Sequence, residues 1–128
     1  MTTYLKKDVY EKLVGKSTDI KQSKYKNKKI EYDGILFDSK KEMSWYIKFK
    51  LMEKSGEISE LKRQVKYELQ PKYQFKGKSI RQILYIADFT YKKNGIIHVI
   101  DVKGYRNEIY KLKKKIFEYK YGIEIEEL

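Results

Sequence analysis

The sequence predicts an α/β (α+β) fold, in which a mixed β-sheet is flanked by helices. Two observations lead to this fold class. A helix with clear start and stop signals follows a short hairpin and precedes an alternating strand pattern. A second helix lies between an apolar strand and the last strand pattern, and such a connection favours parallel pairing with a right-handed crossover. The 128 residues are enough for one modest hydrophobic core.

The N-terminal segment, residues 1–28, is predicted to be a basic arm preceding a main domain that spans residues 29–128. Apolar residues recur at helical spacing in the first part of this segment, and a short helix is expected to end at Gly15. Residues 16–29 are polar and contain six lysines against one aspartate. This stretch is either an arm that a partner orders or a disordered linker.

A hairpin and a helix are predicted to open the main domain. Residues 29–37 read as two short strands joined by Asp33-Gly34, and such a two-residue turn is typical of hairpins. Ser39 and Glu42 match the Ser-x-x-Glu capping box that begins a helix, and Gly56 is a good helix-ending residue. The stripe of this helix that faces the core is expected to comprise Met43, Tyr46, Ile47, Lys50 and Leu51, flanked by Trp45 and Phe49.

Three strands are predicted after this helix. Residues 64–70 alternate between apolar and polar and are stopped by a proline. A basic loop over residues 72–79 leads to a strand over residues 81–90. Its hairpin partner, residues 96–102, is nearly all apolar, as expected for a strand covered on both faces. Asn94-Gly95 supplies the turn between these two strands.

A second helix and a last strand complete the predicted fold. The helix is expected to begin at Tyr105 or Asn107 and to end at Tyr121, with Gly122 as its stop. Residues 123–125 read as the final strand. The apolar stripe of the helix is predicted to comprise Ile109, Leu112, Ile116 and Phe117.

The charge balance indicates a polyanionic partner. The chain carries 30 Lys+Arg against 18 Asp+Glu, a formal net charge of +12, which favours nucleic acid first and an anionic membrane second. A solvated lysine-rich surface is the alternative. The 13 tyrosines either stack on bases or pack in the core.

Several classes of site are excluded by composition. The chain has no cysteine, which excludes disulfides, a thiolate nucleophile and cysteine-ligated zinc. No apolar run reaches membrane-spanning length, and the N-terminus lacks the apolar segment of a signal peptide. We therefore expect a cytoplasmic protein without a membrane partner. The single histidine, His98, lies in an apolar strand and is expected to be structural.

Three charged residues carry the candidate chemistry. Asp88 and Asp101 lie on the two strands of the predicted hairpin, and Lys103 follows the second aspartate by one strand period. Two close carboxylates repel unless a cation or proton lies between them, and hard oxygen ligands suit Mg²⁺ or Mn²⁺. Such a metal activates water for phosphodiester hydrolysis, and the lysine could orient that water or neutralise phosphate charge.

Plainer interpretations exist for each of these residues. Asp88 could be a strand-end aspartate paired with a lysine, and Asp101 with Lys103 could form an exposed ion pair before a turn. Gly104 leaves room for close approach of a ligand, which favours the site. Glu42 could reach the strand ends, although the capping box alone explains a glutamate at this position.

The arrangement of these residues resembles the PD-(D/E)XK nuclease superfamily, which has the restriction-endonuclease-like fold. The resemblance covers about residues 29–128 and follows the core order α-β-β-β-α-β after a β-hairpin. Asp88 corresponds to the first motif acid and Asp101-Val102-Lys103 to the second half of the motif. The chain departs from the pattern at Ala87, where a proline often stands.

The resemblance extends to small phage-encoded proteins that look related to endonuclease I-type Holliday-junction resolvases and to transposase endonuclease subunits. The likeness rests on residues 32–42, Tyr-Asp-Gly-Ile-Leu-Phe-Asp-Ser-Lys-Lys-Glu, and on residues 61–64, Leu-Lys-Arg-Gln. It implies Mg²⁺ or Mn²⁺ bound by Asp88, Asp101, Glu42 and the backbone carbonyl of Val102. It also implies a contact from Gln64 to the scissile phosphate or the metal-bound water.

The resemblance therefore implies a metal-dependent phage or prophage DNA endonuclease that is selective for branched DNA and uses no small-molecule cofactor. Resolution of a junction needs two coordinated cuts and so a homodimer. A DNA-binding module that does not cut, or a recombination or anti-host interaction protein of the same fold, is the alternative. The residues expected to contact nucleic acid are Lys24, Lys26, Lys28, Lys29, Lys40, Lys41, Arg106, Lys111, Lys113 and Lys114.

Overall fold

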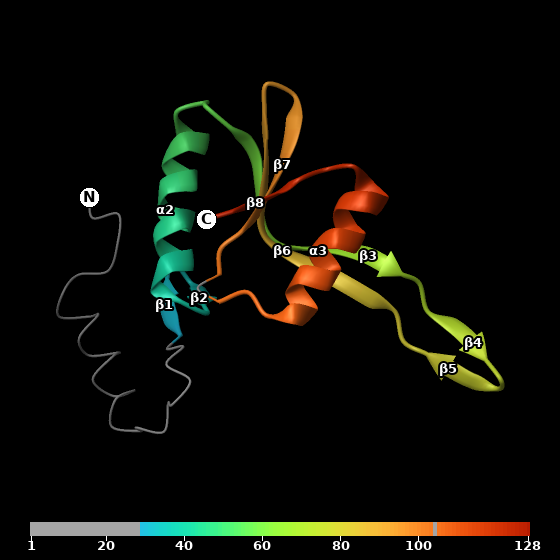
Figure 1. Ribbon diagram of the computed structural model, residues 1–128. Coiled ribbons are helices and arrows are strands. Elements are labelled where there is room, and N and C mark those ends of the chain that lie inside the picture. Colours follow the sequence, from blue (N-terminus) through green and yellow to red (C-terminus); the bar gives the residue numbers. More distant parts are fainter. Residues whose placement is uncertain (1–28, 104) are drawn as a thin grey trace, which may run out of the picture. The chain divides into compact units, whose positions relative to one another are not determined.

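The computed structural model describes residues 29–103 and 105–128, and the chain divides into two compact units between Met52 and Glu53. The described residues form a mixed α+β fold with two helices, a four-stranded mixed sheet and two small hairpins (Figure 1). This confirms the predicted fold class. The helix and basic arm predicted within residues 1–28 lie outside the described residues. None of the described helices is long and apolar enough to cross a membrane.

The first unit contains the predicted opening hairpin. Strands β1 (Ile30–Tyr32) and β2 (Ile35–Phe37) pair antiparallel. Both turn residues adopt left-handed backbone angles, with φ of 57° at Asp33 and 76° at Gly34. These angles match the twist of the strands, which explains why Asp-Gly turns favour hairpins.

Helix α2 (Lys40–Lys54) follows, and its first turn is capped as predicted. The Glu42 N–H donates to Ser39 Oγ at 3.1 Å. The Tyr46 ring packs on Phe37, with ring centroids 5.1 Å apart. The predicted stripe is wrong at Lys50 and Leu51, which are exposed, and the buried residues of α2 are Glu42, Met43, Tyr46, Ile47 and Phe49.

The second unit is built on a four-stranded sheet in the order β3-β6-β7-β8. Strand β3 (Ser59–Gln70) pairs antiparallel with β6 (Ile83–Lys93), and β6 pairs antiparallel with β7 (Ile96–Asp101). Strand β8 (Ile125–Glu127) pairs parallel with β7, which agrees with the crossover predicted from the helix between them. The predicted order of these four strands along the chain is thus confirmed. Strand β3 begins earlier than predicted, β6 spans residues 83–93 rather than 81–90, and β8 spans residues 125–127 rather than 123–125.

Strand β7 is less covered than its apolar sequence suggested. Ile96 and Ile97 are exposed, and continuous burial begins only at Val99 and runs to Val102. The prediction of a strand buried on both faces is therefore wrong for the first half of β7. Its buried end is the part that carries Asp101.

The basic loop predicted for residues 72–79 is instead a small hairpin. Strand β4 (Tyr73–Phe75) pairs antiparallel with β5 (Lys78–Ile80) around a turn at Lys76-Gly77. This hairpin projects beyond the four-stranded sheet in continuation of β3 and β6 (Figure 1).

Helix α3 (Glu108–Tyr121) packs on the sheet and completes the core. Asn107 caps its first turn by accepting from the Tyr110 N–H at 2.8 Å, and Gly122 ends it with a φ of 68°. The predicted stripe is wrong at Ile109 and Leu112, both of which are exposed. The buried residues that make the core of this unit are Leu69, Tyr85, Ala87, Val99, Tyr110, Phe117 and Ile125.

Candidate active site

Asp88 and Asp101 meet at the buried end of the β6–β7 hairpin. The register pairs Phe89 with Ile100, so the next positions along the two strands are those of the two aspartates. Asp88 is 6% exposed and Asp101 is 0% exposed. The Asn94-Gly95 turn, with φ of 54° and 78°, fixes this register. Burial of two facing carboxylates is unfavourable without compensating partners.

The Asp88 carboxylate contacts groups from β3 and from the end of β7. The Val102 N–H donates to Asp88 Oδ2 at 2.7 Å, and Lys103 Nζ lies 3.8 Å from the same oxygen. On the other side, Gln64 Nε2 donates to Asp88 Oδ1 at 3.5 Å. The structure thus brings three sequence-predicted residues, Asp88, Lys103 and Gln64, into one cluster.

The Asp101 carboxylate has one satisfied oxygen and one orphan. The buried Tyr85 hydroxyl donates to Asp101 Oδ2 at 2.8 Å. Asp101 Oδ1 is buried and has no hydrogen-bond partner among the described residues. Burial raises the pKa of Asp101, and the nearby positive charge of Lys103 opposes that rise. Burial also raises the pKa of Tyr85, and the charge of Asp101 adds to the effect, so this phenol stays a donor.

Gln64 holds its place through an unusual backbone conformation. Its φ is 51°, a left-handed value that is rare for a non-glycine residue within a strand. The flanking pairs, Arg63 with Phe89 and Val65 with Ala87, set Gln64 opposite Asp88. Such local strain is common at functional sites, where the surrounding structure holds it in place.

Lys103 follows β7 rather than lying within it, because the strand ends at Asp101. The predicted strand period therefore does not apply between these two residues. The Lys103 side chain is 40% exposed, so its ammonium is open to solvent while it approaches Asp88.

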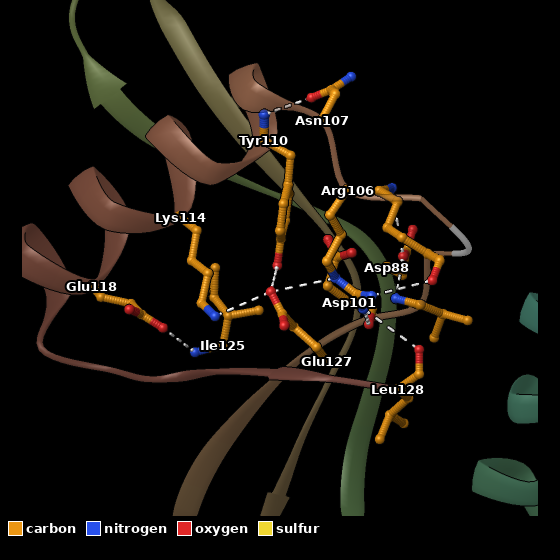
Figure 2. A network of polar contacts seen from close by, with 12 residues as sticks. Asp88, Asp101, Arg106, Asn107, Tyr110, Lys114, Glu118, Ile125, Glu127 and Leu128 are labelled. Carbon is orange, nitrogen blue, oxygen red and sulfur yellow. Dashed lines mark hydrogen bonds and ion pairs between the residues drawn. The ribbon is translucent and has the colours of Figure 1, made fainter.

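Arg106 lies beside Asp101 and Leu128, as Figure 2 shows. Its guanidinium donates from Nη2 to the Asp101 carbonyl at 3.2 Å and from Nη1 to the Lys103 carbonyl at 3.3 Å. It also donates to the Leu128 carbonyl at 3.5 Å and lies 3.3 Å from Glu127. These contacts position the site, and a DNA contact by Arg106 stays a prediction.

Glu127 joins α3 to the end of β8 (Figure 2). It accepts from the Tyr110 hydroxyl at 2.8 Å and from Lys114 Nζ at 3.0 Å. Burial alone would raise the pKa of Glu127, but these two hydrogen bonds and the charge of Arg106 outweigh it and lower the pKa. The cluster fixes the wall of the site on its α3 side.

A cleft of about 240 Å³ lies beside Asp101. Asp101 and Lys103 line it together with residues of β6 and the first turns of α3. Its other lining side chains include Tyr85, Ile86, Tyr110 and Lys113. The cleft gives a ligand access to Lys103, and it mixes apolar walls with two lysines and one buried acid.

Glu42, the remaining predicted acid, belongs to the first unit and is 3% exposed. Its role as a metal ligand beside Asp88 and Asp101 therefore stays a prediction. Of the other predicted contacts in this unit, Lys29 pairs with Asp38 at 2.7 Å, and Lys40 and Lys41 are exposed on the first turn of α2. Lys24, Lys26 and Lys28 lie outside the described residues.

The predicted lysines of α3 differ in their surroundings. Lys113 lines the cleft, whereas Lys111 pairs with Glu108 at 3.4 Å and Lys114 with Glu127. His98 contacts Glu126 and stacks on Tyr91, with ring centroids 5.2 Å apart. It makes ordinary structural contacts in β7.

Sequence reasoning missed Tyr85, Tyr110 and Glu127. Each acts through a partner distant in the sequence: Tyr85 reaches Asp101, and Tyr110 reaches Glu127. No local pattern marks such pairs, because they depend on the strand register and on the way α3 crosses the sheet. The sequence shows that the chain is rich in tyrosines and acidic residues, but it does not show which of them pair.

The donor set at the site suits a hard divalent cation. Two facing carboxylates, one of which has a buried oxygen without a hydrogen-bond partner among the described residues, provide anionic oxygens at this point. Mg²⁺ commonly takes only one or two carboxylates with water and phosphate oxygens. Within residues 29–103 and 105–128, no group of three or more His, Cys, Asp or Glu residues could hold a metal. A metal would therefore depend on water and substrate oxygens for the rest of its coordination.

A comparison with family models gives one match, over residues 22–126, to the family described as "Protein of unknown function (DUF1064)". The match spans most of the chain, and the chain belongs to this family. No curated protein and no solved structure matches the chain.

Proposed function

We propose that this protein is a metal-dependent endonuclease that hydrolyses phosphodiester bonds in DNA. The observation that carries the proposal is the buried Asp101 Oδ1, which lacks a hydrogen-bond partner among the described residues and lies on the strand facing Asp88. A structural carboxylate in this position would be expected to have its oxygens satisfied. A cation would satisfy both the orphaned oxygen and the repulsion between the acids.

The residues around the site have separable roles in this proposal. Asp88 and Asp101 would hold Mg²⁺ or Mn²⁺, which supplies charge stabilisation at the phosphate and a more acidic water. Lys103, with its exposed ammonium 3.8 Å from Asp88, would orient the attacking water or neutralise charge on a phosphate oxygen. Gln64 donates to Asp88 and so positions that carboxylate. The net charge of +12 supports a polyanionic substrate.

The resemblance to junction resolvases leads us to propose selectivity for branched DNA by a homodimer. The test is incubation of the purified protein with supercoiled plasmid and with a synthetic four-way junction, each with Mg²⁺, Mn²⁺ or EDTA. We expect cutting with either metal and none in EDTA. Faster cutting of the junction than of a linear duplex would support the structural selectivity.

The decisive variant is Asp101→Asn, which keeps the shape of the side chain and removes its charge. We expect it to abolish cutting while retaining DNA binding. The matched control is Asp38→Asn, because Asp38 is an exposed aspartate of the first unit. Cutting by Asp101→Asn at the wild-type rate would overturn the assignment of the site.

A DNA-binding module that does not cut is the second candidate. This candidate is supported by the small number of metal ligands at the site: two carboxylates meet there, and the described residues contain no group of three or more His, Cys, Asp or Glu residues that could hold a metal. This candidate predicts salt-sensitive DNA binding that is the same with Mg²⁺ and with EDTA. Binding without cutting in any metal would favour it over the nuclease.

A further inference from the structure

The hairpin formed by β4 and β5, here called the β4–β5 ribbon (residues 71–82), makes no contribution to the core. Residues 71–79 are all exposed, including Tyr73 at 45% and Phe75 at 56%. The ribbon projects beyond the sheet as an extension of β3 and β6 (Figure 1). Aromatic rings exposed on a projecting element are typical of a binding surface.

The charge of the β4–β5 ribbon has one sign. Four cations lie on it, and no acidic residue occurs between Glu68 and Asp88. Lys76 lies over the Phe75 ring at 5.5 Å from its centroid. The four cations are Lys72, Lys76, Lys78 and Arg81.

The other hairpin tip of this unit provides a contrast. Lys92 and Lys93 directly precede the Asn94-Gly95 turn, and their ammonium groups lie 3.5 Å from Glu60 and 3.7 Å from Glu57, respectively. The two hairpin tips therefore differ in charge. The lysines of the β6–β7 tip pair with acidic residues, whereas the ribbon carries cations and exposed aromatic rings without an acidic residue in its sequence. An anionic partner would be attracted to the ribbon and not to the β6–β7 tip.

The two faces of the ribbon differ in chemistry. Gln74 pairs with Ser79, which places both polar side chains on one face, and Tyr73 pairs with Ile80 on the other. A two-stranded ribbon fits the major groove of B-form DNA, where glutamine and serine can hydrogen-bond to base edges. The major groove of A-form RNA is too narrow for such an element.

We propose that the β4–β5 ribbon inserts into the major groove of duplex DNA, with its lysines on the flanking phosphates. The inference deepens the proposed function, because it assigns duplex DNA rather than RNA as the ligand of the same unit. Nine positions separate Gln64 from Tyr73, so the ribbon lies at most about 30 Å from the carboxylates. A duplex of about 30 base pairs can therefore reach both.

The test measures binding by fluorescence anisotropy in EDTA, so that it does not depend on cutting. The variants are Lys76→Ala with Lys78→Ala, and separately Phe75→Ala. The matched control is Lys92→Ala with Lys93→Ala, which removes the same charge from the other hairpin tip. For the ribbon double variant we expect the slope of log K against log salt to become shallower by up to about 1.8, or about 0.9 for each lost phosphate contact. The control should keep the wild-type slope.

Phe75→Ala should weaken duplex DNA binding and leave the salt slope unchanged, since it removes no charge. Double-stranded RNA of the same sequence should bind more weakly, with equal affinity for wild type and ribbon variant. Equal slopes for ribbon and control variants, or equal losses on RNA and DNA, would overturn the inference. So would a ribbon variant that turns a dimer into a monomer with DNA binding unchanged.

The two proposals fail separately. If the wild type cuts DNA and the ribbon substitutions leave DNA binding unchanged, the ribbon proposal is wrong and the nuclease proposal stands. If the wild type does not cut DNA with any metal and the ribbon substitutions weaken DNA binding, the nuclease proposal is wrong and the ribbon proposal stands. Absence of DNA binding by the wild type overturns the ribbon assignment.

Discussion

The Tyr85 hydroxyl donates a buried 2.8 Å hydrogen bond to Asp101 Oδ2 and so connects β6 to the acid at the end of β7. This bond leaves only Oδ1 of that carboxylate without a described partner. A single phenol therefore determines which oxygen of Asp101 is available to a cation.

Replacing Tyr85 by phenylalanine removes that donor with little change in shape. We expect Tyr85→Phe to lose about 1–3 kcal/mol of unfolding free energy at pH 7, because a buried carboxylate oxygen loses its partner. Urea denaturation measures the change. Tyr119→Phe is the control, since Tyr119 is 92% exposed. Equal stability of the two variants would show that the Tyr85 bond contributes nothing.

Asp101→Asn should stabilise the metal-free protein near neutral pH. Burial raises the pKa of Asp101, so ionising it costs more in the folded than in the unfolded state. The wild type should lose stability as the pH rises from the ordinary aspartate value to the raised one, and the variant should not. Urea unfolding in EDTA across this pH range tests the sign. Added Mg²⁺ should raise the melting temperature of the wild type only.

Lys103→Ala should impair cutting more than folding. The side chain is 40% exposed, so its removal leaves no cavity, and the loss of the cation 3.8 Å from Asp88 should lower the unfolding free energy only slightly. Loss of a positive charge at the phosphate is expected to slow cutting about 100-fold or more. Single-turnover cutting of a labelled junction gives the rate. Lys115→Ala on the exposed side of α3 serves as the control. A rate loss shared by both variants would point to general charge rather than to Lys103.

The Glu127 cluster predicts a loss of stability in acid. The pKa of Glu127 is lowered in the fold, so its contribution is present above its ordinary pKa and is lost as the pH falls through the lowered value. At pH 7, Glu127→Gln should cost about 1 kcal/mol or less, since the group is partly exposed. In urea denaturation, the difference from wild type should vanish once the pH falls below the lowered pKa. Glu124→Gln should show no difference at either pH.

The elements with local signals were predicted from the sequence. Asn107 and Gly122 mark the two ends of α3, and the Asn94-Gly95 turn predicts the hairpin that sets Asp88 opposite Asp101. These signals work because caps and turns depend on the conformations of a few adjacent residues.

The buried face of α3 was predicted correctly at Ile116 and Phe117 but not in the first turns of the helix, where it depends on the sheet beneath. Ile109 and Leu112 have the more apolar side chains, yet Tyr110 is buried, since its hydroxyl reaches Glu127 at the end of β8. The β4–β5 hairpin was missed for a different reason. Its strands bury nothing, so their sequence lacks the alternation that marks a strand on a core.

The Asn94-Gly95 turn also has a consequence for folding kinetics. Only thirteen positions separate Asp88 from Asp101, so their hairpin can close within microseconds, whereas the pairing of β8 with β7 spans the whole of α3. We therefore expect the hairpin to be formed in the folding transition state, where the two acids would already repel each other. We expect Asp101→Asn to refold faster than wild type in stopped-flow experiments without metal, and an unchanged refolding rate would mean that the acids meet late. The pair proposed to bind the metal would thus also limit how fast the sheet assembles.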